Sequence, residues 1–189
     1  AIEENRVIAR GENRAFDHIY LTVDADQVRS LLPKKLAPYM EQVRVQPLSV
    51  VSVGYRQASL KTPGFGALAP SKEKEPFLGI LFDSSIFPQQ NQKEGEKRFT
   101  VMIQGLHDEE ELRTIALDGI ERYLAIGIKP DYMGFERYEK GICQCLPGHQ
   151  ANMEGLAKEL EGSPLSVHAT FFHGPSVNAC VKSSYRASI

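Results

Sequence analysis

Hydrophobic residues alternate with polar ones along several short stretches of the chain. A period of two residues predicts strands, because successive side chains of a strand point to opposite faces. The last of these stretches is also rich in β-branched and aromatic residues, which strands favour. The predicted strands cover residues 43–55, 77–82, 98–106, 130–138 and 165–172.

The N-terminal region predicts a β-hairpin followed by a short helix. Residues 6–10 and 16–23 flank Gly11 and Asn13, which supply the turn. Asp24 followed by Gln27 forms a capping-box pattern, which predicts a helix to Leu32 that Pro33 stops.

Apolar residues at helical spacing predict two further helices. Asp108, followed by three glutamates, opens the first, because acidic side chains favour the positive end of a helix. Gly127 is predicted to end it. The second covers 148–161 and stops at a Gly-Ser-Pro sequence.

The C-terminal stretch predicts a strand, a tight turn and a helix. Gly174 is the predicted N-cap and Pro175 the first helical residue. A strand that leads into a helix start is a potential anion site, because backbone N–H groups there have no partner within the helix.

About six strands and four helices predict an α+β fold, in which a largely antiparallel mixed sheet is covered by helices. A chain of 189 residues favours a single domain over 1–189. Its predicted parts are a hairpin and helix (1–33), a sheet with a helix (43–140), and a helix, strand and C-terminal helix (148–189).

Composition excludes several classes of function. The formal net charge is −2, with scattered basic residues, so no nucleic-acid partner is predicted. No apolar run approaches the roughly 20 residues of a membrane span. Three cysteines do not indicate a disulfide framework.

The chain resembles protoporphyrinogen oxidase, a flavoenzyme family of haem synthesis. The resemblance covers most of the chain from about Asp17 onward. Upstream it is closest in Arg98-Phe99-Thr100-Val101-Met102, and it includes Gly64-Phe65-Gly66 and Gly148-His149. At the C-terminal end the shared residues are Gly174, Val177, Asn178, Cys180 and Ser183.

This resemblance implies a fold like the substrate-side region and the C-terminal strand and helix of a flavin oxidase. In the family, the final strand and helix help hold FAD. The implied cofactor-binding residues are Gly174, Ser176, Val177 and Asn178.

The chain departs from the family in ways that bear on FAD. It contains no Gly-x-Gly-x-x-Gly turn, which dinucleotide-binding folds use for the pyrophosphate and which the family carries in its N-terminal part. Bulky Phe171 and Phe172 precede the turn, and Pro175 removes a backbone N–H. We therefore expect no cofactor to be bound by this chain alone, and FAD only if the missing N-terminal half is present.

The family's sheet roofs a tetrapyrrole cavity, which implies an apolar ligand face here. The alternative for most of its aromatic and methionine residues is core packing. The implied ligand-binding residues are Phe65, Phe82, Phe99, Met102, Ile142 and His149.

No catalytic or metal-binding residue is predicted. His168 and His173 lie at positions of opposite parity on the predicted strand and its turn, which makes them poor partners for one metal. Cys143 and Cys145 form one pair without a second Cys or His pair, which is a weak metal signal.

Three functional hypotheses follow. The first is a non-catalytic relative that binds a tetrapyrrole-like or other apolar ligand, or a partner chain or second copy through an exposed sheet face. The second is a fragment of an active FAD-dependent protoporphyrinogen oxidase, which would be mitochondrial or membrane-associated if the resemblance carries over. The third is a structural protein that assembles through its sheet and through Cys143 and Cys145.

Overall fold

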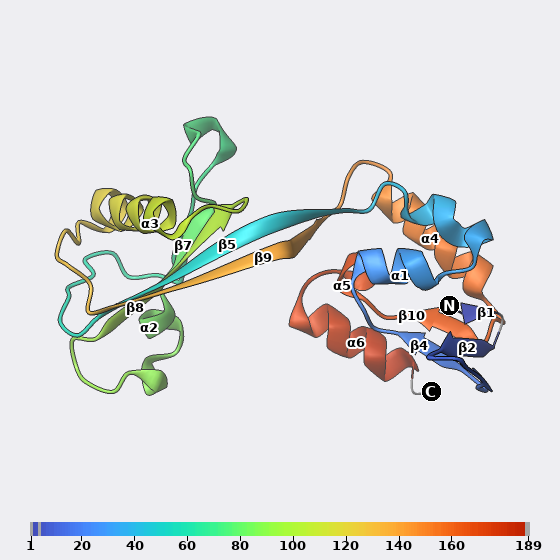
Figure 1. Cartoon of the computed structure of the whole chain (residues 1–189). Coiled ribbons are helices and arrows are strands. Elements are labelled where there is room, and N and C mark those ends of the chain that lie inside the picture. Colours follow the sequence, from blue (N-terminus) through green and yellow to red (C-terminus); the bar gives the residue numbers. More distant parts are fainter. Residues whose placement is uncertain (1, 4, 188–189) are drawn as a thin grey trace. The chain divides into compact units, whose positions relative to one another are not determined.

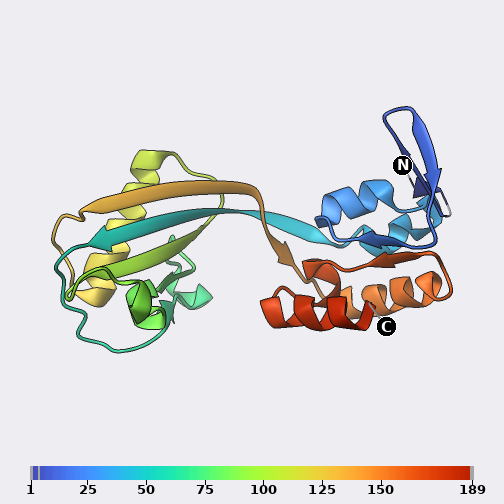
Figure 2. The ribbon, with the colours of Figure 1, turned by 90° about the horizontal axis from the view of Figure 1, so that it is seen from below.

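The computed structural model describes residues 2, 3 and 5–187. The chain divides into two compact units, which are labelled by their elements in Figure 1 and seen from below in Figure 2. Unit 1 comprises residues 1–45 and 143–189, and unit 2 comprises residues 46–142. The boundaries fall within two long strands, β5 (Arg44–Tyr55) and β9 (Tyr132–Gln144). The single domain expected from the sequence stays a prediction.

Unit 2 is built on a five-stranded sheet with the order β6-β7-β8-β5-β9. Its other strands are β6 (Gly66–Leu68), β7 (Gly79–Leu81) and β8 (Lys97–Gln104). The β6–β7, β7–β8 and β5–β8 pairs are antiparallel. The predicted α+β class with a largely antiparallel sheet is confirmed.

One face of this sheet packs against helix α3 (Glu109–Leu124) (Figure 1). The helix begins as predicted, because the Asp108 side chain accepts a hydrogen bond from the Glu111 N–H. The predicted end at Gly127 is wrong. Ala125 already adopts a left-handed conformation with φ of 55° and donates its N–H to the Glu121 carbonyl, which closes the helix three residues earlier.

The core of unit 2 lies between α3 and alternate residues of β5 and β8. These residues are less than 2% exposed. Because side chains alternate along a strand, the residues between them form the opposite, open face of the sheet. The core residues of these three elements are Val51, Val53, Tyr55, Phe99, Val101, Ile103, Leu112, Ala116 and Ile120.

Three short helices accompany the sheet: η2 (Ser71–Glu73), α2 (Asp83–Ile86) and η3 (Pro88–Gln90). Thr100, on the open face, donates its hydroxyl to Asp83 at 2.8 Å. The Arg98 guanidinium bonds the side chain of Asn91 at 3.0 Å. These contacts place residues 83–91 beside the open face, at the β8 end that carries Arg98.

Unit 1 contains a two-stranded parallel sheet of β4 (Ile19–Leu21) and β10 (Leu165–Val167). Its helices are α1 (Ala25–Leu31), η1 (Lys34–Met40), α4 (His149–Leu160), α5 (Thr170–His173) and α6 (Val177–Ala187). The predicted cap of α1 is confirmed, because Asp24 accepts a hydrogen bond from the Gln27 N–H at 2.9 Å.

The core of unit 1 packs one face of the parallel sheet against α1 and α4. Its members include apolar residues from both strands and from these helices. The apolar residues of 148–161 that are buried are Met153, Leu156 and Leu160, whereas Ala157 is exposed. Other strand and helix residues of this core include Leu21, Val28, Leu165, Val167 and Phe171.

The N-terminal hairpin is shorter than predicted. It pairs β2 (Arg6–Ala9) with β3 (Glu12–Ala15), and β1 (Ile2–Glu3) pairs with β2. Arg10 and Gly11 both have positive φ, which is the geometry of a two-residue type I′ turn. The predicted second strand over 16–23 is therefore wrong as a hairpin partner, and only its residues 19–21 form a strand, in the parallel sheet.

The predicted strand over 165–172 is also wrong beyond Val167. Residues 170–173 form the short helix α5, in which the N–H groups of Phe172 and His173 both bond the Ala169 carbonyl. The partner strand β4 ends at Leu21, whose carbonyl accepts a hydrogen bond from the His168 N–H, so the β4 ladder offers no partner to the residues that follow. Two elements have no counterpart in the predictions: residues 34–40 form η1 and residues 66–68 form β6.

Among the described residues, no helix is both long and apolar enough to cross a membrane.

Candidate functional site

The second face of the parallel sheet in unit 1 is polar. Ser166 pairs with Tyr20 across the sheet, and His168 follows Ser166 by two positions. These side chains therefore share one face, while Leu165 and Val167 point into the core. Parallel strands are usually apolar on both faces, so a polar face here is unusual.

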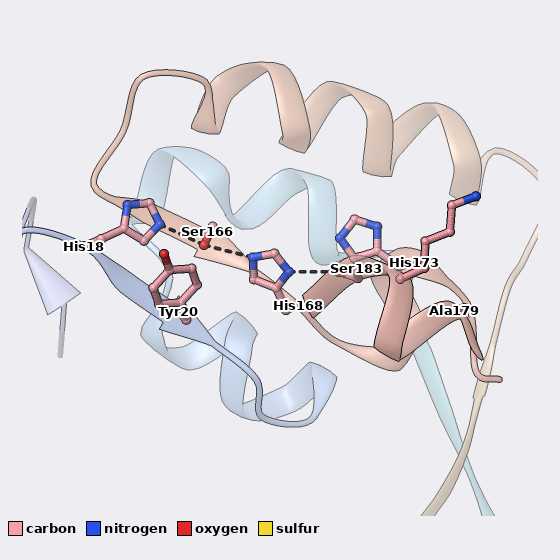
Figure 3. Close-up of a pocket in the computed structure, with 8 residues that line it drawn as sticks. His18, Tyr20, Ser166, His168, His173, Ala179 and Ser183 are labelled. Carbon is pink, nitrogen blue, oxygen red and sulfur yellow. Dashed lines mark hydrogen bonds between the residues drawn. The ribbon is translucent and has the colours of Figure 1, made fainter. Parts of the chain in front are cut away.

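Hydrogen bonds join this face to α6 in a continuous chain (Figure 3). The Ser166 hydroxyl lies 2.9 Å from His18 Nε2 and 3.1 Å from His168 Nε2. The other ring nitrogen of His168, Nδ1, lies 2.8 Å from the hydroxyl of Ser183 on α6. A neutral imidazole donates from one nitrogen and accepts at the other, so His168 can bond both hydroxyls at once.

These residues line a cavity of about 550 Å³ within unit 1. Its wall combines imidazoles and hydroxyls with one ammonium group and contains no carboxylate. The complete lining is His18, Tyr20, Ser166, His168, His173, Ala179, Lys182 and Ser183.

The pKa of His168 is lowered from its ordinary value near 6.5. Burial is the largest cause, because it disfavours the charged ring, and the neighbouring His173 and His18 repel a further positive charge. The pKa of His107 in unit 2 shifts the other way. A hydrogen bond to the Gln104 carbonyl raises it, and Glu111 adds to this effect.

These opposite shifts predict opposite effects on stability. In acid the unfolded chain takes up a proton at His168 more readily than the folded chain, so we expect His168 to lower stability as pH falls below about 6.5. The stabilisation from His107 is complete below about 6.5 and is lost as pH rises through its raised folded pKa. Unfolding free energies of His168→Asn and His107→Gln at pH 5.5 and 7.5 test this. Relative to the unsubstituted chain, lowering the pH from 7.5 to 5.5 should make His168→Asn more stable and His107→Gln less stable.

The residues implied to bind FAD lie at the start of α6. Gly174 has φ of 109° and forms the turn. The helix begins at Val177, and the Ser176 hydroxyl caps it by accepting a hydrogen bond from the Ala179 N–H at 3.1 Å. Gly174 is therefore not the N-cap that the sequence predicted. Val177 is 79% exposed, and Asn178 is also exposed.

This helix start does not fit an entire FAD. The Ser176 hydroxyl already bonds one first-turn N–H, and Pro175 has none to offer. The remaining N–H groups of the first turn suit at most one anionic group. A dinucleotide normally places its pyrophosphate on a Gly-x-Gly-x-x-Gly turn. No such turn occurs in the sequence.

The structure does not assemble the six implied ligand-binding residues into one site. Phe82 and Phe99 lie in the core of unit 2, where their rings meet edge to face at 5.9 Å. Phe82 and Phe99 therefore pack in the core, which was the alternative to ligand binding that the sequence offered. Met102 is half-buried on the opposite face of the sheet. Phe65 is 69% exposed before β6, and Ile142 is exposed near the end of β9.

His149 belongs to unit 1 and has a structural contact. Its Nε2 lies 2.7 Å from the Phe171 carbonyl, which ties the start of α4 to α5. His149 and Gly174 line the same smaller cavity of about 330 Å³, together with Phe171 and Phe172. Two of the ten implied site residues therefore meet in one pocket.

The open face of the unit 2 sheet carries a different set of side chains. Val50 pairs with Met102 across β5 and β8. Tyr132 of β9 is 62% exposed and lies beside Gly54, where an added Cβ would be 3.4 Å from the Tyr132 Cβ. An added Cβ at Gly134 would be 2.6 Å from the Tyr132 hydroxyl, so the tyrosine ring lies along the strand over this glycine.

Sequence reasoning considered His168 and His173 but separated them by parity. The structure brings their ring centroids to 5.8 Å, because the chain leaves the strand after Val167 and turns into α5. His18 and Lys182 were not identified as site residues. The alternation of polar residues at 18 and 20, and at 166 and 168, was the available signal.

Cys143 carries little reactivity in this arrangement. Burial raises the pKa of the Cys143 thiol to about 11, and the neighbouring Cys145 adds to the shift. A thiol with so high a pKa is a poor nucleophile at neutral pH. Within the described part of the chain, no group of three or more His, Cys, Asp or Glu residues could hold a metal ion.

No family model matches the chain. It is 29% identical over 188 residues to protoporphyrinogen oxidase of Bos taurus, a match that covers 91% of this chain and 39% of that protein. The chain thus spans about two fifths of the length of the relative. The predicted resemblance to protoporphyrinogen oxidase is confirmed at this level.

Solved structures show the same fold. A candidate protoporphyrinogen oxidase from Exiguobacterium sp. 255-15 superposes with a TM-score of 0.80 at 16% identity, over 99% of this chain and 44% of that one. Cyclohexylamine oxidase from Brevibacterium oxydans superposes with a TM-score of 0.73 at 14% identity, over 98% and 45%. The chain therefore has the fold of part of a flavin oxidase.

Proposed function

We propose that this polypeptide is a binding unit related to protoporphyrinogen oxidase, and that it carries out no oxidation by itself. The ligand that we propose is a flat apolar molecule of the tetrapyrrole class. The observation that supports this most is the open face of the unit 2 sheet, where apolar side chains remain half-exposed opposite a complete core.

The shape of this face suits a flat molecule. Gly54 carries no side chain to project from it, and the Tyr132 ring lies along the strand over Gly134. Val50 and Met102 supply apolar contact area, and Tyr132 adds a large exposed ring. Aromatic and methionine side chains contribute much of the binding energy at such surfaces.

The polar groups beside the face suit the acidic groups of a tetrapyrrole. Arg98 pairs with Gly54 across β5 and β8, which places it on the open face near Tyr132. Its guanidinium bonds Asn91 and the Phe87 carbonyl and forms an ion pair with Glu96 at 3.3 Å, so a ligand carboxylate would share it with Glu96. A guanidinium in this position can pair with a carboxylate.

We expect the purified chain to bind protoporphyrin and to shift its main absorption band to longer wavelength. The variant Tyr132→Ser should weaken binding about tenfold, because buried tyrosines are frequent centres of binding energy. The matched control is Tyr185→Ser, which changes an equally exposed tyrosine of unit 1. Absorption titrations with protoporphyrin measure both variants.

Equal weakening by both variants, or no binding by the unsubstituted chain, would contradict the proposal. In the second case, self-association in sedimentation experiments that Tyr132→Ser abolishes would assign the face to a second copy instead.

The length of the chain favours a second candidate function. Because it spans 39% of its bovine relative, it can be part of a complete oxidase whose other part binds FAD. We expect the chain with added FAD to oxidise protoporphyrinogen no faster than the spontaneous reaction in air. Turnover by the isolated chain would overturn the proposed function, and an intact mass about two and a half times that of this chain in native material would favour the second candidate.

A further inference from the structure

The cavity on the polar face of unit 1 plays no part in the proposed function. It lies on the β4–β10 sheet and α6, and all its lining residues belong to unit 1. Lys182, which lines it, makes no ion pair with any residue in the described part of the chain. A cation without a counter-charge beside several imidazoles suits a negatively charged ligand.

Aromatic rings run along the same face in an unbroken row. The centroids of His18 and Tyr20 are 4.5 Å apart, those of Tyr20 and His168 are 5.7 Å apart, and those of His168 and His173 are 5.8 Å apart. Each pair is tilted rather than parallel. About half of the Tyr20 side chain is exposed, so its ring is accessible for stacking with a bound ring.

The arrangement does not suit a metal cation. A metal needs a ring nitrogen with a free lone pair, but both ring nitrogens of His168 bond the hydroxyls of Ser166 and Ser183. The ammonium of Lys182 would also repel a cation. The cavity wall contains no carboxylate to offset this repulsion.

We propose that this cavity binds a small aromatic anion, that is, an aromatic ring bearing a phosphate or carboxylate group. The ring would stack on Tyr20, and the anionic group would lie against Lys182 and His173. The cavity volume of about 550 Å³ suits a ligand of this size, since small-molecule sites have volumes of roughly 300–1,000 Å³.

Protonation of the imidazoles would strengthen this binding. The ionisable groups of the cavity are His18 and Tyr20 of β4 and its preceding turn, His168 after β10, His173 of α5 and Lys182 of α6. Asp17 neighbours His18 in sequence but does not line the cavity. A bound anion favours the charged form of an imidazole, so affinity should fall as pH rises.

The test uses the complete chain and four probes: phenyl phosphate, benzoate, inorganic phosphate and phenol. Imidazole resonances in NMR spectra at pH 6.0 report binding at His18, His168 and His173. We expect phenyl phosphate and benzoate to shift these resonances, with inorganic phosphate weaker by about tenfold because it lacks the stacked ring. Phenol tests the charge requirement and should bind at least tenfold more weakly than phenyl phosphate.

The variant Lys182→Gln should weaken phenyl phosphate binding about tenfold, because it removes a charge-assisted contact. Its matched control is Lys158→Gln, which changes an exposed lysine of α4 in the same unit and should have no effect. Tyr20→Val should weaken phenyl phosphate and leave inorganic phosphate unchanged. Raising the pH from 6.0 to 8.0 should weaken the binding of both anions.

Three results would overturn the proposal: no resonance shift with either aromatic anion, equal binding of phenol and phenyl phosphate, or equal effects of Lys182→Gln and Lys158→Gln. Because these probes and variants concern unit 1, the outcome is independent of protoporphyrin binding on unit 2.

Discussion

Replacing Phe99 by alanine is expected to lower the free energy of unfolding of unit 2 by about 3–5 kcal/mol. Phe99 is 1% exposed, and its ring meets Tyr55 and Phe82 edge to face at 6.1 Å and 5.9 Å. Truncation removes buried apolar area and leaves a cavity that the sheet and α3 can fill only in part. Amide hydrogen exchange of β8 residues measures the loss within unit 2, without assuming that both units unfold together.

The matched control for this substitution is Met102→Ala on the same strand. Met102 lies three positions along β8 on the open face and is only half-buried, so its loss should cost less than about 1 kcal/mol. The sequence allowed Phe99 to be either a ligand contact or a core residue. If Phe99→Ala left hydrogen exchange unchanged but weakened protoporphyrin binding, the core assignment would be wrong.

The long elements of this fold could be predicted because several local signals agree there. The period of two residues over 43–55 predicts β5, and the capped, amphipathic pattern after Asp108 predicts α3. The caps at Asp24 and Asp108 depend only on neighbouring residues, so they need no knowledge of tertiary structure.

The C-terminal stretch shows where composition misleads. Residues 165–172 carry the β-branched and aromatic side chains of a strand, and their buried positions are Leu165, Val167, Ala169 and Phe171. The period of two therefore continues through the helical turn, so burial alone does not distinguish this turn from a longer strand. The strand stops where its partner β4 ends at Leu21, a residue that lies far away in the sequence.

The same long-range pairing hides the polar cavity from sequence reasoning. The register that sets Tyr20 beside Ser166 joins the two ends of the chain, and no local pattern encodes it. The cofactor candidates from Gly174 to Asn178 could be located from turn chemistry and resemblance. Their surroundings could not, because the cap from Ser176 and the contact of His149 with Phe171 depend on how the helices pack.

The corresponding experiment in unit 1 is Phe171→Ala, for which we expect a loss of about 3–5 kcal/mol in the free energy of unfolding. Phe171 is 2% exposed in the core that α1 and α4 share with the parallel sheet. Its carbonyl also accepts the hydrogen bond from buried His149, so a collapse of α5 around the new cavity would disturb the start of α4 as well.

Phe172→Ala is the matched control, since the neighbouring ring is half-buried and packs on Phe171 and His173 with centroids 6.4 Å and 4.6 Å away. We expect Phe172→Ala to lower the free energy of unfolding by about 1 kcal/mol, because most of the surface of the Phe172 ring is not buried in the core. Hydrogen exchange of α4 amides measures both variants. Equal losses would mean that α5 presents both rings to the core alike. A much larger loss for Phe171→Ala would show that Phe171, rather than its neighbour, holds α5 to the core of unit 1.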